Sequence, residues 1–594
     1  MYVIATAGHV DHGKSTLIKR LTGMEPDRWA EERRRGLTIG LGFAWTTLRG
    51  GARVAFVDVP GHERFVSTML AGVGPVPAVL FVVAADEGWM PQSEEHLSAL
   101  DALGVRHALL VVTRSDLADP GPALAQATAR LAGTSLRDAR SVAVSAVTGD
   151  GLDALERELA RLVTGLPAAN PDADVRLWLD RGFTIDGSGT VVTGTLAAGT
   201  VRVGDELVLA STGHTVRVRG VRSLGDIHRS VSALARVAVN LRGTDRSSIR
   251  RGDALLTEGA WLTTDLLDVA HTADDDLAGE LMFHIGSAAV AVRVRPLGPR
   301  GARLRLRSAL PLRIGDRALL RDPGRHRVAA AVDVLDVRPP ELTRRGAARR
   351  RADVLESLAR GGPADAMAIH LTQRGFVRSA ELRAMGLPVP AADPLPGDWY
   401  VDDLLRKEII ARLPSEVDSW IRRNPLRDGV PVETVRQMLD LPHTVLVGRF
   451  ARDAGLRVDG GAVRRPGARS ELPVTVERAV AALTAQLRRD PFAAPDANRL
   501  RELGLGPREL AAAERAGRLA RVSAEVVLLP DFEGKATGVL AALPQPFTLS
   551  EARVSLNTTR RVAVPLLELL DRKGITERLT DGTHRLRRAP ASGP

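Results

Sequence analysis

The sequence predicts a multidomain protein: an α/β domain with a phosphate-binding loop (P-loop), two β-barrel domains, and then an all-helical, winged-helix tandem array. Three observations predict this order. A Gly-framed loop joins a strand to a helix at residues 8–15, short β-branched runs between Gly turns follow residue 171, and short amphipathic helices alternate with turns after residue 340. The 594 residues suffice for several cores, since a single core rarely exceeds about 250 residues.

The first motif is the loop at residues 8–15, which has the spacing G-x-x-x-x-G-K-S. Gly8 and Gly13 allow backbone N–H groups to point inward at phosphate oxygens, and the positive end of the following helix favours their charge. Lys14 would reach the β- and γ-phosphates, and the Ser15 hydroxyl would ligate Mg²⁺. The alternative is a chance Gly-rich turn, which the strand–helix context disfavours. The predicted loop residues are Gly8, His9, Val10, Asp11, His12, Gly13, Lys14, Ser15 and Thr16.

Three further residues are predicted to act on the γ-phosphate and the metal ion. Thr38 lies in a Gly-flanked segment after a charged stretch, so its hydroxyl is the candidate sensor of Mg²⁺ and the γ-phosphate. Asp58 follows a buried strand and can hold the Mg²⁺ shell through water, while Gly61 can offer its N–H to the γ-phosphate. His62 is either an ordinary loop histidine or the catalytic group that orients the attacking water, and the preceding Asp-x-x-Gly favours the second. The predicted magnesium residues are Ser15, Thr38 and Asp58.

Two later strands end in loops that are predicted to read a guanine base. The Asp116 carboxylate can accept both N1–H and N2–H₂ of guanine, a donor pair that adenine lacks. Backbone around Ala146 can meet the guanine O6. The predicted base contacts are Thr113, Arg114, Asp116, Ser145, Ala146 and Val147, so the expected cofactors are GTP or GDP and Mg²⁺.

Composition restricts the chemistry and the partners. The absence of cysteine excludes disulfides, thiolate–metal sites and thiol nucleophiles. The formal net charge of +11 favours a polyanionic partner, although an arginine-rich composition produces such a charge without function, and 3% aromatic residues disfavour extensive base stacking. No apolar run reaches the roughly 18 residues that span a bilayer, and no export signal leads the chain. We therefore expect a cytoplasmic monomer with no membrane partner.

The motifs of residues 1–165 jointly resemble the G domain of the translational GTPases. That resemblance implies a GTPase that hydrolyses GTP to GDP and phosphate when the ribosome stimulates it. One departure is that the family's Asn-Lys-x-Asp is here Thr113-Arg114-Ser115-Asp116. Arg114 can cover the base as lysine would, but Thr113 lacks an amide. Guanine specificity is still expected, with weaker binding or faster exchange of the nucleotide as one consequence.

The β-barrel domains are predicted at residues 172–260 and 261–340. The run 181–195 resembles the second domain of elongation factors, most closely the selenocysteine-specific ones. The resemblance implies a selenocysteine pocket at Asp180, Arg181 and Arg236. Two guanidiniums would favour a selenolate over a serine hydroxyl, and Asp180 would hold one of them in place. The alternative is an exposed ion pair of little energetic value.

The region 341–594 is predicted to hold about four winged-helix units, the last at about 534–594. Its basic start, residues 344–351, is either a solvated linker or an RNA contact, and helices are expected over 402–412 and 558–573, among others. The terminal unit resembles that of selenocysteine-specific elongation factors, which implies binding of an mRNA hairpin (SECIS). Winged helices more often bind DNA, so the motif alone leaves both open. The predicted RNA-binding residues are Arg560, Arg561, Arg585 and Arg587.

The resemblance covers essentially the whole chain, more loosely over 341–550. It implies a GTP-dependent factor that delivers selenocysteinyl-tRNA to the ribosome at recoded UGA codons. A general translational GTPase or a sulfate-activating GTPase remains an alternative, but neither explains the winged helices. A nucleotide-gated DNA-binding regulator is the alternative from another class.

Overall fold

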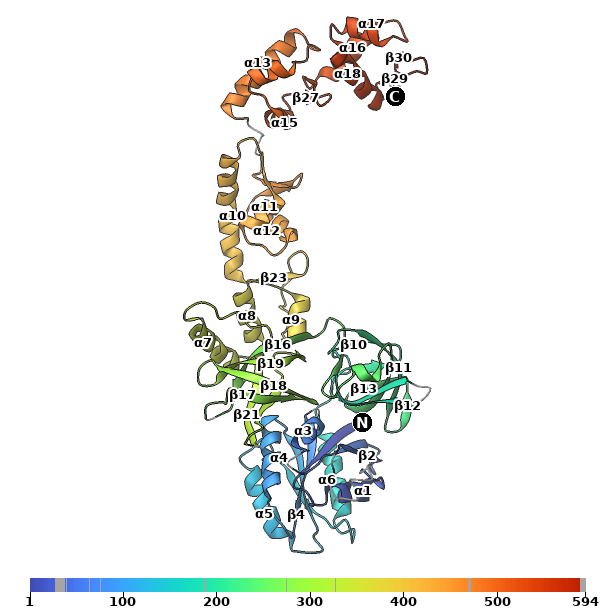
Figure 1. Cartoon of the computed structure of the whole chain (residues 1–594), viewed down its shortest axis with the longest axis vertical. Helices are drawn as coiled ribbons and strands as arrows, with labels where there is room; N and C mark the ends of the chain where they lie inside the picture. Colours follow the sequence, from blue (N-terminus) through green and yellow to red (C-terminus); the bar gives the residue numbers. More distant parts are fainter. Residues whose placement is uncertain are drawn as a thin grey trace. The chain divides into compact units, whose positions relative to one another are not determined.

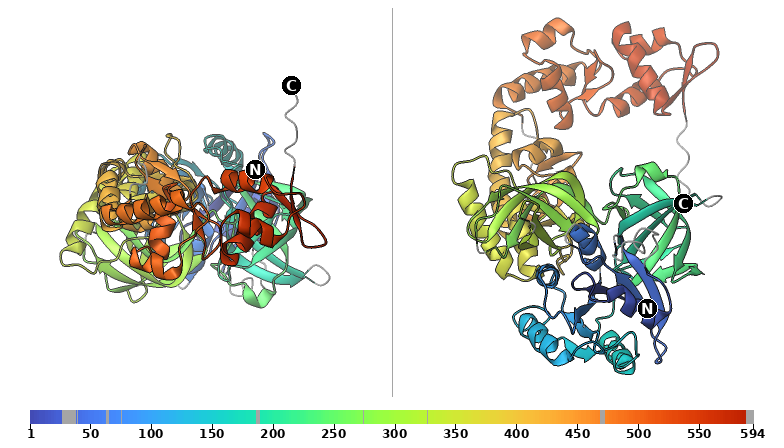
Figure 2. Two further views of the ribbon diagram at one scale, coloured as in Figure 1. Left: turned by 90° about the horizontal axis from the view of Figure 1, so that it is seen from above. Right: turned by 60° about the horizontal axis from the view of Figure 1, so that its bottom comes forward.

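The computed structural model describes residues 1–26, 38, 40–62, 65–74, 76–185, 189–273, 275–325, 327–467 and 472–587. The chain divides into two compact units, Met1–Ala392 and Asp393–Pro594. The first unit holds the predicted α/β domain and both predicted barrels, and the second holds helices with small hairpins (Figure 1; Figure 2). The predicted fold class is confirmed, while the exact domain boundaries stay predictions.

The α/β domain is a six-stranded sheet in the order β2-β3-β1-β4-β5-β6. Only the β2–β3 pair is antiparallel, and all other neighbours run parallel. Parallel strands are buried on both faces, so β4 is a continuous apolar run with every residue buried. The strands are β1 (Tyr2–Ala7), β2 (Gly42–Thr47), β3 (Arg53–Asp58), β4 (Ala78–Ala84), β5 (His107–Thr113) and β6 (Arg140–Ala143).

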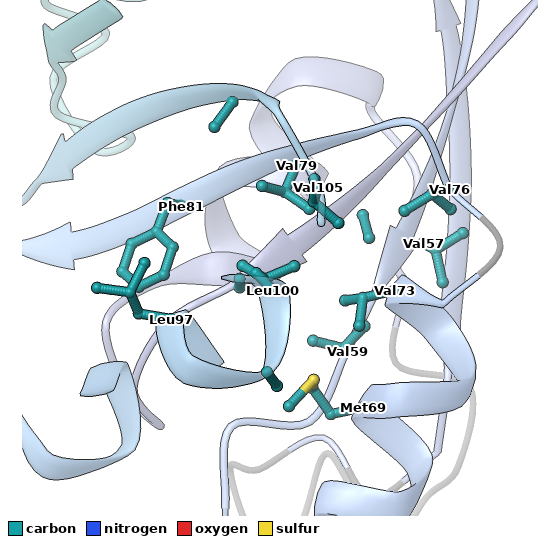
Figure 3. Close-up of a cluster of buried hydrophobic side chains, with 14 of the residues drawn as sticks. Val57, Val59, Met69, Val73, Val76, Val79, Phe81, Leu97, Leu100 and Val105 are labelled. Atoms are coloured by element: carbon teal, nitrogen blue, oxygen red, sulfur yellow. The ribbon is translucent and has the colours of Figure 1, made fainter. Parts of the chain in front are cut away.

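Helices cover both faces of this sheet. Figure 3 shows Phe81 of β4 beside Leu97 and Leu100 of α4, and Val57 of β3 beside Val73 of α3. This core fixes the carboxyl ends of the strands, where an open α/β sheet binds its ligand. The helices are α1 (Lys14–Thr22), α3 (Val66–Val73), α4 (Pro91–Ala102), α5 (Pro120–Leu131) and α6 (Leu152–Thr164).

The first barrel is a seven-stranded sheet, β10-β15-β7-β8-β14-β11-β12, that closes through an additional β10–β11 pairing. Burial alternates along β14, as expected when one face of a strand lines a core. At Gly194 an added Cβ would lie 2.3 Å from the Trp178 carbonyl oxygen, so this strand requires glycine there. The strands are β7 (Arg176–Ile185), β8 (Gly189–Leu196), β10 (Glu206–Leu209), β11 (Thr215–Ser223), β12 (Asp226–His228), β14 (Ala235–Arg242) and β15 (Ala254–Leu256).

The second barrel is closed in the order β16-β19-β18-β17-β20-β21. Its strands are β16 (Leu262–His271), β17 (Glu280–Ile285), β18 (Ala288–Pro296), β19 (Gly301–Leu312), β20 (Arg317–Asp322) and β21 (Arg327–Asp336). Helices α7 (Ala347–Arg360), α8 (Pro363–Arg374) and α9 (Ser379–Met385) follow within the same compact unit.

Buried charges fasten α7 to the second barrel. Arg351 donates from Nε to Asp268 Oδ2 (2.7 Å) and from Nη2 to Asp336 Oδ2 (2.6 Å), and Arg303 binds the other oxygen of Asp268 (2.7 Å). Both carboxylates are fully buried. The last arginine of the basic segment 344–351 therefore has a structural role, and the compact unit extends to residue 392, past the expected boundary at 340.

The second unit contains successive groups of helices followed by a hairpin, which is the winged-helix order. Its elements include β23 (Trp399–Val401), α10 (Asp403–Arg423), β24 (Val430–Pro431), α11 (Val432–Met438), α12 (Val447–Asp453), β25 (Arg457–Asp459), β26 (Ala462–Arg464), α13 (Val474–Arg489), α14 (Ala497–Glu502), α15 (Pro507–Arg515), β27 (Ala520–Arg521), β28 (Val527–Leu528), α16 (Phe532–Ala541), α17 (Leu549–Ser555), α18 (Arg560–Arg572), β29 (Thr576–Arg578) and β30 (His584–Leu586). Buried residues from α13 to α18 form one continuous cluster, so the last two units share a core.

Helix α10 continues well beyond the predicted end at residue 412, through Pro414. A proline inside a helix removes one hydrogen bond and costs about 3 kcal/mol. Leu413 and Val417 are fully buried on the same face, and their packing offsets that cost. Within the described residues, no helix is long and apolar enough to span a bilayer.

Candidate functional site

The predicted phosphate-binding loop curls around its own lysine. Gly8 has φ +128°, and an added Cβ would lie 2.1 Å from the Val82 carbonyl oxygen, so only glycine fits at this position. Gly13 (φ +76°) caps α1 at its amino end. Lys14 Nζ donates to the carbonyl oxygens of Gly8 (3.1 Å) and His9 (2.5 Å), which places its charge at the centre of the loop.

Two residues of α4 accept hydrogen bonds from the backbone of this loop. The Gly8 N–H donates to His96 Nδ1 (3.0 Å), and the Val10 N–H donates to Gln92 Oε1 (2.9 Å). Burial lowers the pKa of His96 to about 3, with the Lys14 charge acting in the same direction, so the ring is neutral and Nδ1 is free to accept. Sequence reasoning missed both residues. Their only signal was a pair of polar side chains four positions apart on one face of a predicted helix.

The three predicted magnesium residues lie together. Ser15 Oγ donates to Asp58 Oδ2 (2.6 Å) and lies 3.0 Å from Thr38 Oγ1. Thr6 Oγ1, which was not predicted, donates to the other oxygen of Asp58 (2.7 Å) and accepts from the Val59 N–H (3.0 Å). The fully buried carboxylate is therefore held in one orientation. Three hard oxygen groups from three segments suit Mg²⁺; the charged stretch at 27–37 lies outside the described residues.

Gly61 and His62 follow β3 at the same edge of the sheet. An added Cβ at Gly61 would lie 2.5 Å from the Val10 nitrogen and 2.7 Å from Lys14 Nζ, so the backbone here touches the phosphate loop. The pKa of His9 is lowered mainly by burial and by Lys14, and the nearby His62 acts in the same direction. His62 directly follows Gly61 and therefore lies close to the phosphate loop.

The two predicted base-reading loops follow neighbouring strands, β5 and β6. Thr113 Oγ1 donates to the His12 carbonyl oxygen (2.8 Å), so this hydroxyl ties the first loop to the phosphate loop. Arg114 Nη1 binds Asp86 (2.9 Å) and Glu87 (2.7 Å), and Nη2 binds the Asp11 carbonyl oxygen. The hydroxyl of Thr113 thus anchors the phosphate loop, although Thr113 lacks the side-chain amide of the asparagine that is usual in the family.

Residues at the carboxyl ends of these strands differ in exposure. Asp116 and Val147 are exposed, Ala146 is half-buried, and Ser145 is fully buried, where its Oγ accepts from the Thr148 N–H (3.0 Å). The buried serine fixes the second loop. The exposed carboxylate and the half-buried backbone remain accessible to a base.

A second site lies between β2 of the α/β domain and the first barrel. Arg236 binds both oxygens of Asp180, Nη2 to Oδ1 at 2.7 Å, and Thr193 Oγ1 donates to Oδ1 (2.8 Å). Both guanidiniums face the ring of Phe43, at 3.9 Å for Arg236 and 5.1 Å for Arg181. Arg181 also donates to the Leu41 carbonyl oxygen.

Phe43, Arg181, Thr193 and Arg236 line a pocket of about 260 Å³, to which Arg222 also contributes. The predicted trio thus converges: Arg181 and Arg236 line the pocket, and Asp180 binds Arg236 without lining it. Sequence reasoning missed Phe43, which the α/β domain supplies only five residues after Thr38.

The four predicted RNA-binding arginines lie in the last winged-helix unit. Arg560 and Arg561 begin α18, but Arg561 donates to the carbonyl oxygens of Glu525 (3.0 Å), Ala494 (2.9 Å) and Pro495 (3.1 Å). The guanidinium of Arg561 therefore joins the last two units. In the terminal hairpin, Arg585 (3.1 Å) and Arg587 (3.7 Å) both pair with Glu577.

Comparisons with known proteins agree with this arrangement. Residues 1–165 match the elongation factor Tu GTP binding domain, 189–256 match elongation factor Tu domain 2, and 539–585 match the elongation factor SelB winged helix. The first domain therefore binds a guanine nucleotide.

Curated relatives include the selenocysteine-specific elongation factors of Desulfomicrobium baculatum, 36% identical over 405 residues, and of Escherichia coli K12, 37% identical over 389 residues. Each alignment covers 64% of this chain and 63% or 62% of the relative, so the match spans less than two thirds of their length. A crystal structure of a bacterial selenocysteine-specific elongation factor, EF-Sec, matches 99% of this chain and 100% of its own, with a TM-score of 0.80 and 25% identity. The chain belongs to the translational GTPases, within their family of selenocysteine-specific elongation factors.

Proposed function

We propose that this protein delivers selenocysteinyl-tRNA to the ribosome at recoded UGA codons in a GTP-dependent step, while its carboxyl-terminal winged helices hold an mRNA SECIS hairpin. The observation that carries the proposal is the pocket lined by Arg181, Arg222 and Arg236, with Asp180 bound to Arg236 beside it. Arginines outnumber the one carboxylate here, so the pocket favours an anionic side chain. A selenol is largely ionised at neutral pH and a serine hydroxyl is not.

The first domain supplies the GTPase step. Lys14 and the loop N–H groups bind the β- and γ-phosphates, and Ser15 and Thr38 would ligate Mg²⁺ while Asp58 holds it through water. Mg²⁺ held by these residues would neutralise charge that develops on the phosphates during transfer. His62 orients the attacking water, and the Gly61 N–H binds the γ-phosphate. Exposed Asp116 reads the guanine edge.

The geometry also supports a link between the nucleotide and the pocket. Thr38 lies against the predicted magnesium residues, and Phe43, on the strand that follows, forms one wall of the pocket. A γ-phosphate that orders Thr38 would therefore stabilise the pocket wall. We infer that the aminoacyl group binds tightly in the GTP form and is released after hydrolysis.

The test compares dissociation rates of selenocysteinyl-tRNA and of the same tRNA bearing serine from the 594-residue chain with GTP. Each charge-assisted contact contributes about 1.5–3 kcal/mol, so the two arginines predict a discrimination on the order of a hundredfold or more. Equal rates for the two tRNAs would instead indicate a general elongation factor. A parallel assay compares an mRNA hairpin with duplex DNA, and preferential DNA binding would support the regulator.

A further inference from the structure

Arg251 of the first barrel reaches the helix that follows His62. Its Nη1 donates to Thr68 Oγ1 (3.1 Å) and its Nη2 donates to the Ser67 carbonyl oxygen (3.1 Å), and both acceptors lie in the first turn of α3. That helix begins at Val66, four residues after His62, and the Phe65 N–H donates to the His62 carbonyl oxygen (2.9 Å). In Figure 1, α3 lies where the α/β domain meets the barrels.

The same turn of the barrel is bonded to the strand that carries Asp180. The Gly252 N–H donates to the Leu179 carbonyl oxygen (2.9 Å), and the Leu179 N–H donates to the Asp253 carbonyl oxygen (2.8 Å). Leu179 immediately precedes Asp180. Partial burial lowers the pKa of Arg251, and the Asp180 carboxylate opposes this shift, so the two charged groups interact.

A continuous series of contacts thus runs from the pocket to α3. It passes from Asp180 to the Leu179 backbone, to the turn at 251–253, and through the Arg251 guanidinium to Ser67 and Thr68. Gly61 touches the phosphate loop and α3 begins five residues further along the chain, so the two acceptors lie close in sequence to the nucleotide site.

We propose that Arg251 is a positioning residue that couples the aminoacyl pocket to the nucleotide state through α3. This proposal rests on the proposed function. With GTP bound, α3 presents Ser67 and Thr68 to the guanidinium, which holds the turn and hence Asp180 in the geometry that receives the aminoacyl group. Such coupling is reciprocal, so selenocysteinyl-tRNA raises the affinity for GTP by the same factor as GTP raises the affinity for the tRNA.

The experiment measures the dissociation constant of selenocysteinyl-tRNA in the GTP and GDP forms of the whole chain and reports their ratio. Arg251→Met keeps the length of the side chain but removes both donors, and we expect it to lower the ratio about tenfold, within the 5–150-fold range usual for coupling. Arg251→Lys retains a charged donor and should restore part of the ratio. GTP affinity without tRNA should stay unchanged.

Arg53→Met is the matched control. Arg53 also joins the α/β domain to the first barrel, through an ion pair with Asp226 at 2.9 Å, but this ion pair involves no residue of α3. Its ratio should equal that of the wild type. If Arg251→Met does not fold, Thr68→Val removes one acceptor from the other side and should lower the ratio by a smaller factor.

The outcomes separate the two proposals. A wild-type chain that binds selenocysteinyl-tRNA equally in both nucleotide forms, or not at all, would overturn the proposed function. A wild-type preference for the GTP form that persists undiminished in Arg251→Met, or in Thr68→Val where Arg251→Met fails to fold, would overturn the coupling role while leaving the proposed function intact.

Discussion

Replacing Arg236 with alanine should lower the preference of the pocket for selenocysteinyl-tRNA over the same tRNA bearing serine. In the wild type, two guanidiniums face one carboxylate, and Arg236 binds both oxygens of Asp180. Arg236→Ala removes one positive charge from the pocket and leaves Asp180 without its bidentate partner. A selenolate then meets less positive charge, and the Asp180 carboxylate repels it more strongly.

The magnitude follows from the single charge-assisted interaction that the substitution removes. One such interaction is worth about 1.5–3 kcal/mol, which corresponds to a roughly 10- to 150-fold change in dissociation constant. We expect the preference for selenocysteinyl-tRNA over the serine form to fall by that factor, with GTP affinity unchanged because the nucleotide site is untouched. Arg236→Ala also leaves the buried Asp180 without its ion-pair partner, although Thr193 still donates to it, and this should cost about 3 kcal/mol in the free energy of unfolding.

A double variant tests whether charge in this pocket selects the amino acid. Asp180→Ala combined with Arg236→Ala removes both members of the pair, leaves Arg181 as the remaining charge of the trio, and should recover part of the selectivity lost in Arg236→Ala. The assay is the dissociation rate of each charged tRNA from the GTP form, with thermal unfolding as the measure of stability. Unchanged selectivity in Arg236→Ala, with no difference between the single and double variants, would show that charge in this pocket does not select the amino acid.

Three other sites give direct tests. Lys14→Ala should abolish GTP binding, whereas His62→Ala should bind GTP and hydrolyse it at least roughly tenfold more slowly on ribosomes; equal loss of binding in both would contradict the role of His62. Asp116→Asn should shift the preference from GTP to XTP in a competition assay, and an unchanged preference would remove it from the base site. Arg560→Ala should weaken hairpin binding and reduce its salt dependence by about one phosphate contact. Arg561→Ala should instead lower the melting temperature of the second unit; a melting temperature equal to that of the wild type would contradict its role as a bond between units.

The sequence by itself determined the features that depend on neighbouring residues. The loop at 8–15 could be read directly, because two glycines and one lysine at fixed spacing dictate the backbone path around a phosphate. Alternating burial in β14 and the winged-helix order likewise follow from local periodicity and turns. The resemblance to selenocysteine-specific elongation factors identified Asp180, Arg181 and Arg236 as one pocket. The residues alone could not predict that these three side chains lie together.

Only the tertiary structure decided which distant residues meet. Thr6 orients Asp58 across 52 positions, and His96 supports Gly8 across 88, although neither pair shares a local pattern. The positive charge of an arginine likewise does not identify its partner: Arg351 in the basic segment and Arg561 in α18 both bind acceptors within the protein. The role of a polar side chain depends on which acceptors lie within about 3 Å of it in the folded protein. Tertiary packing sets that distance, whereas local propensity determines only the helix or strand that carries the side chain.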